Sequence, residues 1–122
     1  MSELNDLPVL ILAYNRFDKF YKCFNTLKGQ GIKKIFISID GPTNVDDIII
    51  QKKIISYCNN NKYDMDIKIK YYEFNNGCRL GPLKGISWFF NLNKYGVILE
   101  DDVILSKNCI DAFHFLLKEK IN

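Results

Sequence analysis

The sequence predicts an α/β fold, with a Rossmann-like and mostly parallel sheet of about four strands and helices on both faces. Short apolar runs of β-favouring residues alternate along the chain with segments in which apolar residues recur at helical spacing. No internal repeat, low-complexity tract or linker interrupts this alternation. Because crossovers between parallel strands are right-handed, strands that alternate with helices favour a parallel sheet covered on both sides.

The first predicted strand covers residues 9–14, a continuous apolar run of the kind found in strands buried on both faces. The helix that follows is predicted from aromatic and aliphatic residues at helical spacing, and Gly29 or Gly31 ends it. These residues are Phe17, Phe20, Tyr21, Phe24 and Leu27.

The second predicted strand covers residues 35–39 and stops at Asp40, which precedes a glycine and a proline. Asn44 is followed three residues later by Asp47, a spacing typical of a helix N-cap. We therefore expect a helix over residues 48–58, with a turn of three asparagines after it.

The second half of the chain adds two strands and two helices. Residues 67–71 alternate between apolar residues and lysines, which predicts a third strand with one wet face. Pro82 is expected to open a short helix that runs to Leu92. Residues 97–99 form the fourth predicted strand, and residues 108–120 the last helix.

Composition narrows the class of protein. The chain of 122 residues is expected to form one domain, 1–122, and its net charge of +3 gives no support to nucleic-acid binding. The N-terminus lacks the profile of a signal peptide, and no apolar run is as long as a transmembrane segment. The four cysteines lie far apart without a C-x-x-C pair, which argues against a structural zinc site. We expect a cytoplasmic protein with reduced thiols.

Three neighbouring carboxylates, Glu100, Asp101 and Asp102, follow the fourth predicted strand. Like charges placed together at a strand end repel one another unless a cation relieves them. Mg²⁺ and Mn²⁺ prefer such carboxylate oxygens and commonly bridge to the phosphates of a substrate. The triplet therefore predicts a divalent metal site, and the alternative is a solvated acidic loop that caps the next helix.

Polar residues also follow two other predicted strands: Asn15 and Arg16 after the first, and Asp40 after the second. In parallel sheets, ligands bind beyond the carboxyl ends of the strands, near a switch in strand order. Three polar groups that converge on one edge of the sheet are typical of a nucleotide pocket.

The sequence resembles the N-terminal, nucleotide-sugar-binding part of GT-A-type glycosyltransferases. It is most similar to the branch that includes the N-acetylglucosaminyltransferase I group and its bacterial relatives. Four stretches in this order and spacing carry the resemblance, at residues 8–16, 37–42, 75–81 and 97–103, and together with the following helix they cover nearly the whole chain.

The resemblance implies roles for the acidic triplet, which is similar to a variant of the family's Asp-x-Asp motif. By analogy, Asp102 would ligate Mn²⁺ or Mg²⁺ bridging the phosphates of a sugar nucleotide, most simply a UDP-sugar. Glu100 and Asp101 would face the hydroxyls of the ribose or the sugar. A metal that acts as a Lewis acid offsets the charge that develops on the leaving diphosphate.

The resemblance also implies substrate-binding roles after the first two strands. Arg16 would lie against the uracil or hydrogen-bond to it, and Asp40 would accept a hydrogen bond from the ring N–H of the base. Asn15 has a second interpretation, because with Asp18 three residues later it resembles a capping box. Asp40 has one as well, as a turn residue.

Arg79 and Lys84 are further candidate contacts, because in the family this segment runs along the sugar nucleotide. They flank a glycine-rich crossing that is neither a Walker A loop nor a G-x-G-x-x-G motif. Backbone N–H groups at a helix start suit a diphosphate, although lysines are mostly solvated. Other conspicuous residues are expected to serve structure: the aromatic run 88–90 and the cysteines in the core, and His114 in packing or at the surface.

The predicted function is a metal-dependent glycosyltransferase domain that transfers a sugar to a glycan or lipid-linked acceptor. Complete GT-A domains continue beyond the acidic motif, so the fold is expected to be incomplete at the C-terminus, with weak or absent transfer by the chain alone and no catalytic base to name. Uncovered sheet edge would favour a homo-oligomer. The rivals are a non-catalytic nucleotide-binding or protein-interaction module, and a receiver-like or phosphatase-like domain, which would need an acid after the first strand.

Overall fold

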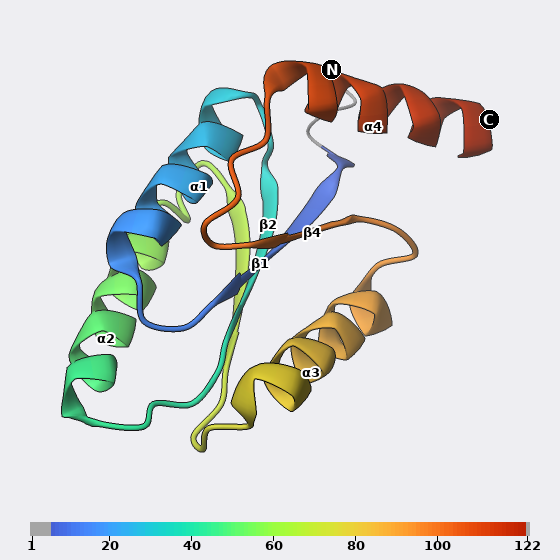
Figure 1. Ribbon diagram of the computed structural model, residues 1–122. Coiled ribbons are helices and arrows are strands. Elements are labelled where there is room, and N and C mark those ends of the chain that lie inside the picture. Colours follow the sequence, from blue (N-terminus) through green and yellow to red (C-terminus); the bar gives the residue numbers. More distant parts are fainter. Residues whose placement is uncertain (1–5, 122) are drawn as a thin grey trace.

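The computed structural model describes residues 6–121 and confirms the predicted α/β fold (Figure 1). Strands and helices alternate along the described chain in the order β1 (Pro8–Ala13), α1 (Phe17–Gly29), β2 (Lys34–Ile39), α2 (Val45–Asn59), β3 (Asp66–Tyr71), α3 (Gly77–Leu92), β4 (Val97–Glu100) and α4 (Lys107–Ile121). Among these residues, no helix is both long and apolar enough to cross a lipid bilayer.

The strands form one parallel sheet in the order β3-β2-β1-β4. The chain passes from β1 to β2 and β3 in one direction, then returns to place β4 on the other side of β1. The crevice between the carboxyl ends of β1 and β4 is therefore the switch point, where open α/β sheets bind ligands.

Both faces of the sheet are covered, as predicted. On one face, Ile11 of β1 and Ile37 of β2 pack in a core with Phe20 of α1 and Ile54 of α2, which Ile110 of α4 extends. On the other face, Leu10 and Phe36 pack against Phe89 of α3. Figure 1 shows α1 and α2 side by side and α3 across the sheet from them. Since β1 lies inside the sheet, its run of apolar residues is buried on both faces.

Most predicted elements lie within a few residues of the observed ones, but the predicted start of α3 was wrong. The helix begins at Gly77, so Pro82 lies inside it rather than at its start. The reason lies outside the segment: the carboxylate of Asp40 accepts the N–H groups of Asn76 at 2.9 Å and Gly77 at 3.1 Å. Donors at a helix start need such an acceptor, and here a distant side chain supplies it. The cap predicted at Asn44 is confirmed, because its Oδ1 accepts the N–H of Asp47 at 2.9 Å.

The structural roles predicted for aromatic residues and cysteines are confirmed only in part. Phe89 is buried, but Phe90 is 44% exposed, so the prediction that places it in the core is wrong. Cys23 and Cys58 are buried, whereas Cys78 and Cys109 are exposed, contrary to the prediction. The side chain of His114 lies outside the described part of the structure.

Two glycines one turn apart allow α3 to lie close to the sheet. A Cβ atom on Gly85 would stand 2.5 Å from Ser38 Oγ and 3.1 Å from a methyl group of Leu12. A Cβ atom on Gly81 would stand 2.7 Å from Asp40 Oδ2. The glycine-rich crossing is therefore needed for packing of α3 over the ends of β1 and β2.

We expect Gly85→Ala to lower the free energy of unfolding by about 1–3 kcal/mol, because overpacking a close contact forces side chains and backbone to shift. Urea denaturation measures this change. Gly29→Ala is the matched control, since nothing lies within 4 Å of a Cβ atom at that helix end. The control should change stability by less than about 0.5 kcal/mol or raise it slightly. Equal losses in the two variants would contradict the close-approach explanation.

Candidate functional site

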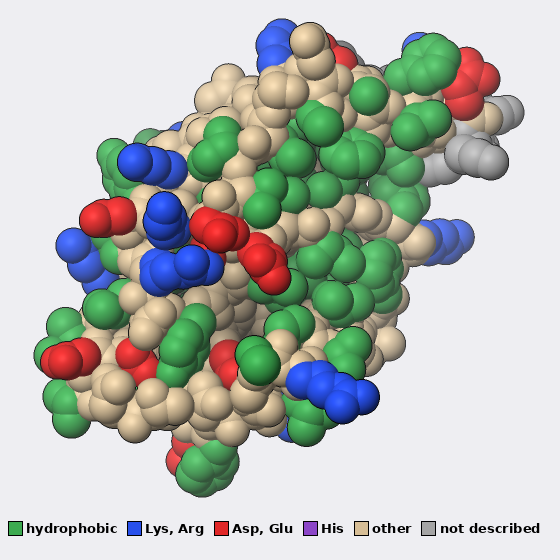
Figure 2. Space-filling view, viewed as in Figure 1, with side chains coloured by type: hydrophobic (Ala, Val, Ile, Leu, Met, Phe, Trp, Pro, Cys, Tyr) green, Lys and Arg blue, Asp and Glu red, His purple; other side chains and the backbone are tan. Residues whose placement is uncertain are grey.

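A cavity of about 370 Å³ opens at the carboxyl ends of β1, β2 and β4, beside the start of α3. Figure 2 shows acidic and basic side chains gathered on this face of the molecule. Of the predicted site residues, the cavity is lined by Arg16, Asp40, Glu100 and Asp101. Its other lining residues are Leu12, Ala13, Tyr14, Ser38, Thr43, Asn75, Gly77, Cys78, Gly81 and Pro82. The structure therefore brings together residues that follow all four strands and lie far apart in the sequence.

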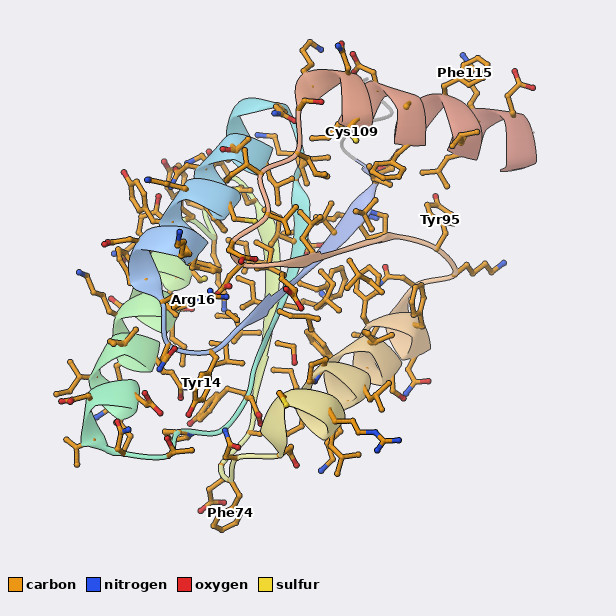
Figure 3. All side chains as sticks on the ribbon, in the orientation of Figure 1. Tyr14, Arg16, Phe74, Tyr95, Cys109 and Phe115 are labelled. Atoms are coloured by element: carbon orange, nitrogen blue, oxygen red, sulfur yellow. The ribbon has the colours of Figure 1, made fainter. Side chains whose placement is uncertain are left out.

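Arg16 and Asp101 form the central ion pair of the site. Arg16 Nη2 lies 2.5 Å from Asp101 Oδ1, and Nη1 lies 3.8 Å from Asp102 Oδ2. Figure 3 places Arg16 just beyond the end of β1. The chain itself therefore supplies a cationic partner for Asp101, namely Arg16.

Asp101 is the most deeply buried of the three acids, with 2% of its side chain exposed. Its backbone N–H donates to the carbonyl of Leu12 at 3.1 Å, which holds the residue against β1. Among the described residues, Asp101 Oδ2 has no hydrogen-bond partner. Burial raises the pKa of Asp101 above its ordinary value, while the adjacent Arg16 opposes this shift.

Asp102 and Glu100 are more open to solvent than Asp101. The side chain of Asp102 is 41% exposed, and Asp102 lies next to the cavity rather than in its lining. Among the side chains that the structure describes, which exclude His114, no group of three or more histidine, cysteine or acidic side chains could hold a metal ion by itself. A metal at Asp102 would therefore need oxygens from phosphates and water, which is how Mg²⁺ is usually bound. The donor set fits a metal bound together with a phosphate ligand.

Asp40 caps a helix in addition to lining the cavity. Its Oδ1 accepts hydrogen bonds from the N–H groups of Gly41 and Asn76 and from Asn76 Nδ2, at 2.8–3.0 Å. Its Oδ2 accepts only the N–H of Gly77 among the described residues. The second oxygen is the one with acceptor capacity left for a ligand.

Asn15 does not cap α1, so that interpretation was wrong. The N-cap residue of α1 is Arg16, and it makes no side-chain capping bond. Asn15 Nδ2 instead donates to Asp47 Oδ1 at 2.9 Å. A partner 32 residues away has replaced the local one.

Arg79 and Lys84 lie outside the residues that line the cavity. Both side chains are exposed on α3. Lys84 Nζ donates to Asn76 Oδ1 at 2.7 Å and lies 5.8 Å from the ring of Tyr72. Like Asn15 and Asp102, these two predicted contacts are not part of the cavity lining.

Two buried residues of α2 hold the loops that form one wall of the cavity. Asp47 Oδ2 accepts hydrogen bonds from the Tyr14 hydroxyl at 2.6 Å and from the N–H and hydroxyl of Thr43 at 3.0 and 2.9 Å. One turn later, Gln51 Nε2 donates to the carbonyls of Tyr14 at 2.9 Å and Asp40 at 2.8 Å. We call Asp47 and Gln51 the α2 clasp.

Sequence reasoning missed the α2 clasp because it assigned Asp47 to local capping and Gln51 to an ordinary helix. The signal that could have found it is the four-residue spacing of two polar residues on one helix face. Asp47 and Gln51 are 3% and 5% exposed, so both needed partners inside the protein.

The hydrogen-bond donors around Asp47 lower its pKa well below the ordinary range, and the Tyr14 hydroxyl is the largest cause. Burial raises the pKa of Tyr14, and the bond to Asp47 raises it further. A carboxyl group whose pKa is lower in the folded state stabilises the fold above its unfolded pKa of about 3.9. That contribution is lost as the pH falls from there toward the folded pKa.

We expect Asp47→Asn to lower the free energy of unfolding at neutral pH. The amide group replaces one acceptor oxygen with an N–H donor, which then faces the donor groups that surround Asp47. The difference from wild type should shrink as the pH falls below about 4, since wild-type Asp47 then loses its advantage. Thermal melts between pH 7 and pH 2 test this. Asp46→Asn, an exposed neighbour in the same helical turn, is the control and should keep the wild-type profile. A loss that is constant across this range would contradict the role of the charge.

Comparisons of the chain with protein-family models, with curated proteins and with solved structures found no match. The resemblance to GT-A-type glycosyltransferases therefore depends on the four sequence stretches alone. Geometry adds that all four of them contribute residues to the lining of the same cavity, among them Arg16, Asp40, Asn75 and Asp101.

Proposed function

We propose that this chain binds a sugar nucleotide as part of a metal-dependent glycosyltransferase, with a UDP-sugar as the best candidate. One observation carries the proposal: Arg16, Asp40 and the acidic triplet, which the sequence marked separately, meet at the switch point of the sheet. Ligand sites in open α/β sheets lie at this place.

The cavity has the chemistry that a nucleoside requires. Its volume of about 370 Å³ falls within the usual range for small-molecule sites. Leu12, Ala13 and Pro82 provide apolar surface for a base, while Tyr14 and Asn75 provide hydroxyl and amide groups. We place the base and ribose in the cavity and the diphosphate at its mouth, beside Asp102.

Asp102 would hold Mn²⁺ or Mg²⁺ together with phosphate oxygens of the donor. When bound, the metal neutralises charge on the departing diphosphate as a Lewis acid. In the transfer itself, the bond from the anomeric carbon to the phosphate oxygen breaks. A bond to the acceptor hydroxyl forms, and the proton of that hydroxyl passes to a base.

Of the three acids that line the cavity, two are engaged within the chain and do not provide a free base for a glycan or lipid-linked acceptor. The third, Glu100, is proposed to face the hydroxyls of the ribose or the sugar. Asp101 is paired with Arg16, and Asp40 is occupied by the start of α3. We therefore propose donor binding with weak or absent transfer by the chain alone, and robust transfer by the purified chain would contradict this. We also propose a cytoplasmic location, which suits four cysteines that form no disulfide among the described residues.

A second candidate is a non-catalytic module with the same fold that binds a nucleotide or a protein partner. The observation that favours it is that Arg16 and Asp40 already have partners within the chain. A protein partner, or a second copy in a homo-oligomer, could cover the edge of β4, which is the last strand of the sheet.

We expect calorimetry to detect UDP binding in the presence of Mn²⁺ and at least about tenfold weaker binding without it, a difference of about 1.4 kcal/mol. Asp102→Asn should remove the metal dependence, because it removes the proposed ligand. Asp66→Asn, an exposed acid at the start of β3, is the control and should bind like wild type. UDP binding that ignores Mn²⁺ would favour the non-catalytic module, and no binding at all would contradict both nucleotide-binding candidates.

A further inference from the structure

The two acids that contact Arg16 hold it very differently. The contact with Asp101 is short, at 2.5 Å, and the Asp101 side chain is 2% exposed. The contact with Asp102 is long, at 3.8 Å, and both of its side chains are open to solvent, at 49% for Arg16 and 41% for Asp102. Removing the partner of a buried carboxylate is costly, whereas exposed pairs at this distance contribute little. Asp102 is therefore the acid that Arg16 can release.

A second observation is an unused hydrogen-bond acceptor at the same place. Asp101 Oδ2 is buried in the cavity wall with no hydrogen-bond partner among the described residues. Buried polar atoms in folded proteins are almost always paired. The acidic triplet thus has more negative charge and more acceptor capacity than Arg16 alone satisfies.

We propose that Arg16 is the internal counter-ion of the acidic triplet and that it gives up Asp102 when a divalent cation binds there. This inference depends on the proposed function, because it assumes that Asp102 is the metal ligand. The guanidinium and the cation repel each other and need the same carboxylate, so each weakens the hold of the other on Asp102. Metal binding by the chain alone is then weak.

The exchange also couples the metal to the nucleotide. Arg16 lines the cavity, so once it leaves Asp102 it remains beside the place proposed for the ligand. A diphosphate would supply negative charge to both cations and so remove the repulsion between them. Metal and nucleotide should therefore bind better together than either binds alone.

The first test measures Mn²⁺ binding without nucleotide, from the electron paramagnetic resonance signal of free Mn²⁺. Arg16→Gln removes the charge and keeps hydrogen-bonding groups, and it should bind Mn²⁺ about fivefold more tightly than wild type. Arg16→Lys keeps the charge and should stay close to wild type. Asp102→Asn should abolish the tight binding in the Arg16→Gln background. Binding by Arg16→Gln that equals or falls below that of wild type would overturn the proposal.

The second test uses the wild-type chain, so it does not depend on the folding of a variant. Arg79 is the only other arginine in the sequence and serves as an internal control. Phenylglyoxal modifies accessible arginines, and mass spectrometry reports each site separately. Mn²⁺ should increase the labelling of Arg16 in the wild-type chain and leave that of Arg79 unchanged. Unchanged or reduced labelling of Arg16 at saturating Mn²⁺ would overturn the proposal.

Failure of this inference can be told apart from failure of the proposed function. If wild type binds UDP with Mn²⁺ but Arg16→Gln gains no affinity for Mn²⁺, only the counter-ion role is wrong. If neither wild type nor Arg16→Gln binds Mn²⁺, with or without UDP, the metal-dependent function and the counter-ion role are both wrong.

Discussion

Parallel pairing of β1 with both β2 and β4 decides where every polar group of the site lies. Because the three strands run the same way, the loops that follow them open at one edge of the sheet. The return of the chain to β4 places Asp101 directly beyond Leu12, where the backbone bond between them continues the ladder. Arg16, four residues further along from Leu12, is then within reach of a carboxylate that lies 85 residues away in sequence.

This arrangement leaves the site with two buried carboxylates of opposite character. Asp47 is surrounded by donors from Tyr14, Asn15 and Thr43, so burial does not prevent its ionisation. Within the described part of the chain, Asp101 pairs with Arg16 and keeps one oxygen without a donor, so burial works against its charge. A carboxylate of the first kind holds structure together, whereas one of the second kind retains capacity to bind. The α2 clasp is therefore a support for the cavity wall, whereas Asp101 lines the cavity itself.

The parts of this molecule that follow from local patterns were predictable from the sequence. The alternation of strands and helices, the cap at Asn44 and the gathering of polar groups at one sheet edge all depend on short-range signals or on parallel topology. The partners of Arg16, Asn15 and Asp40 were not predictable, because each bonds to a residue brought near only by the fold. The misplaced start of α3 has the same cause. A proline rule applied to Pro82 cannot include the capping carboxylate of Asp40, which lies 36 residues before Asn76, whose N–H group it accepts.

The acidic triplet shows that a sequence motif does not by itself identify the cation that pairs with it. Clustered acids at a strand end do require a cation, but the requirement does not say whether the cation is a metal or a side chain. Here Arg16 supplies part of the positive charge, with a short contact to the buried Asp101 and a long contact to the exposed Asp102. A site built only for stability would place its arginine where both acids are satisfied. Among the described residues, Asp102 stays open to solvent and one oxygen of Asp101 has no donor, an arrangement that a bound cation or ligand would complete. This asymmetry adds a physical argument for a binding function to the convergence of polar groups at the switch point.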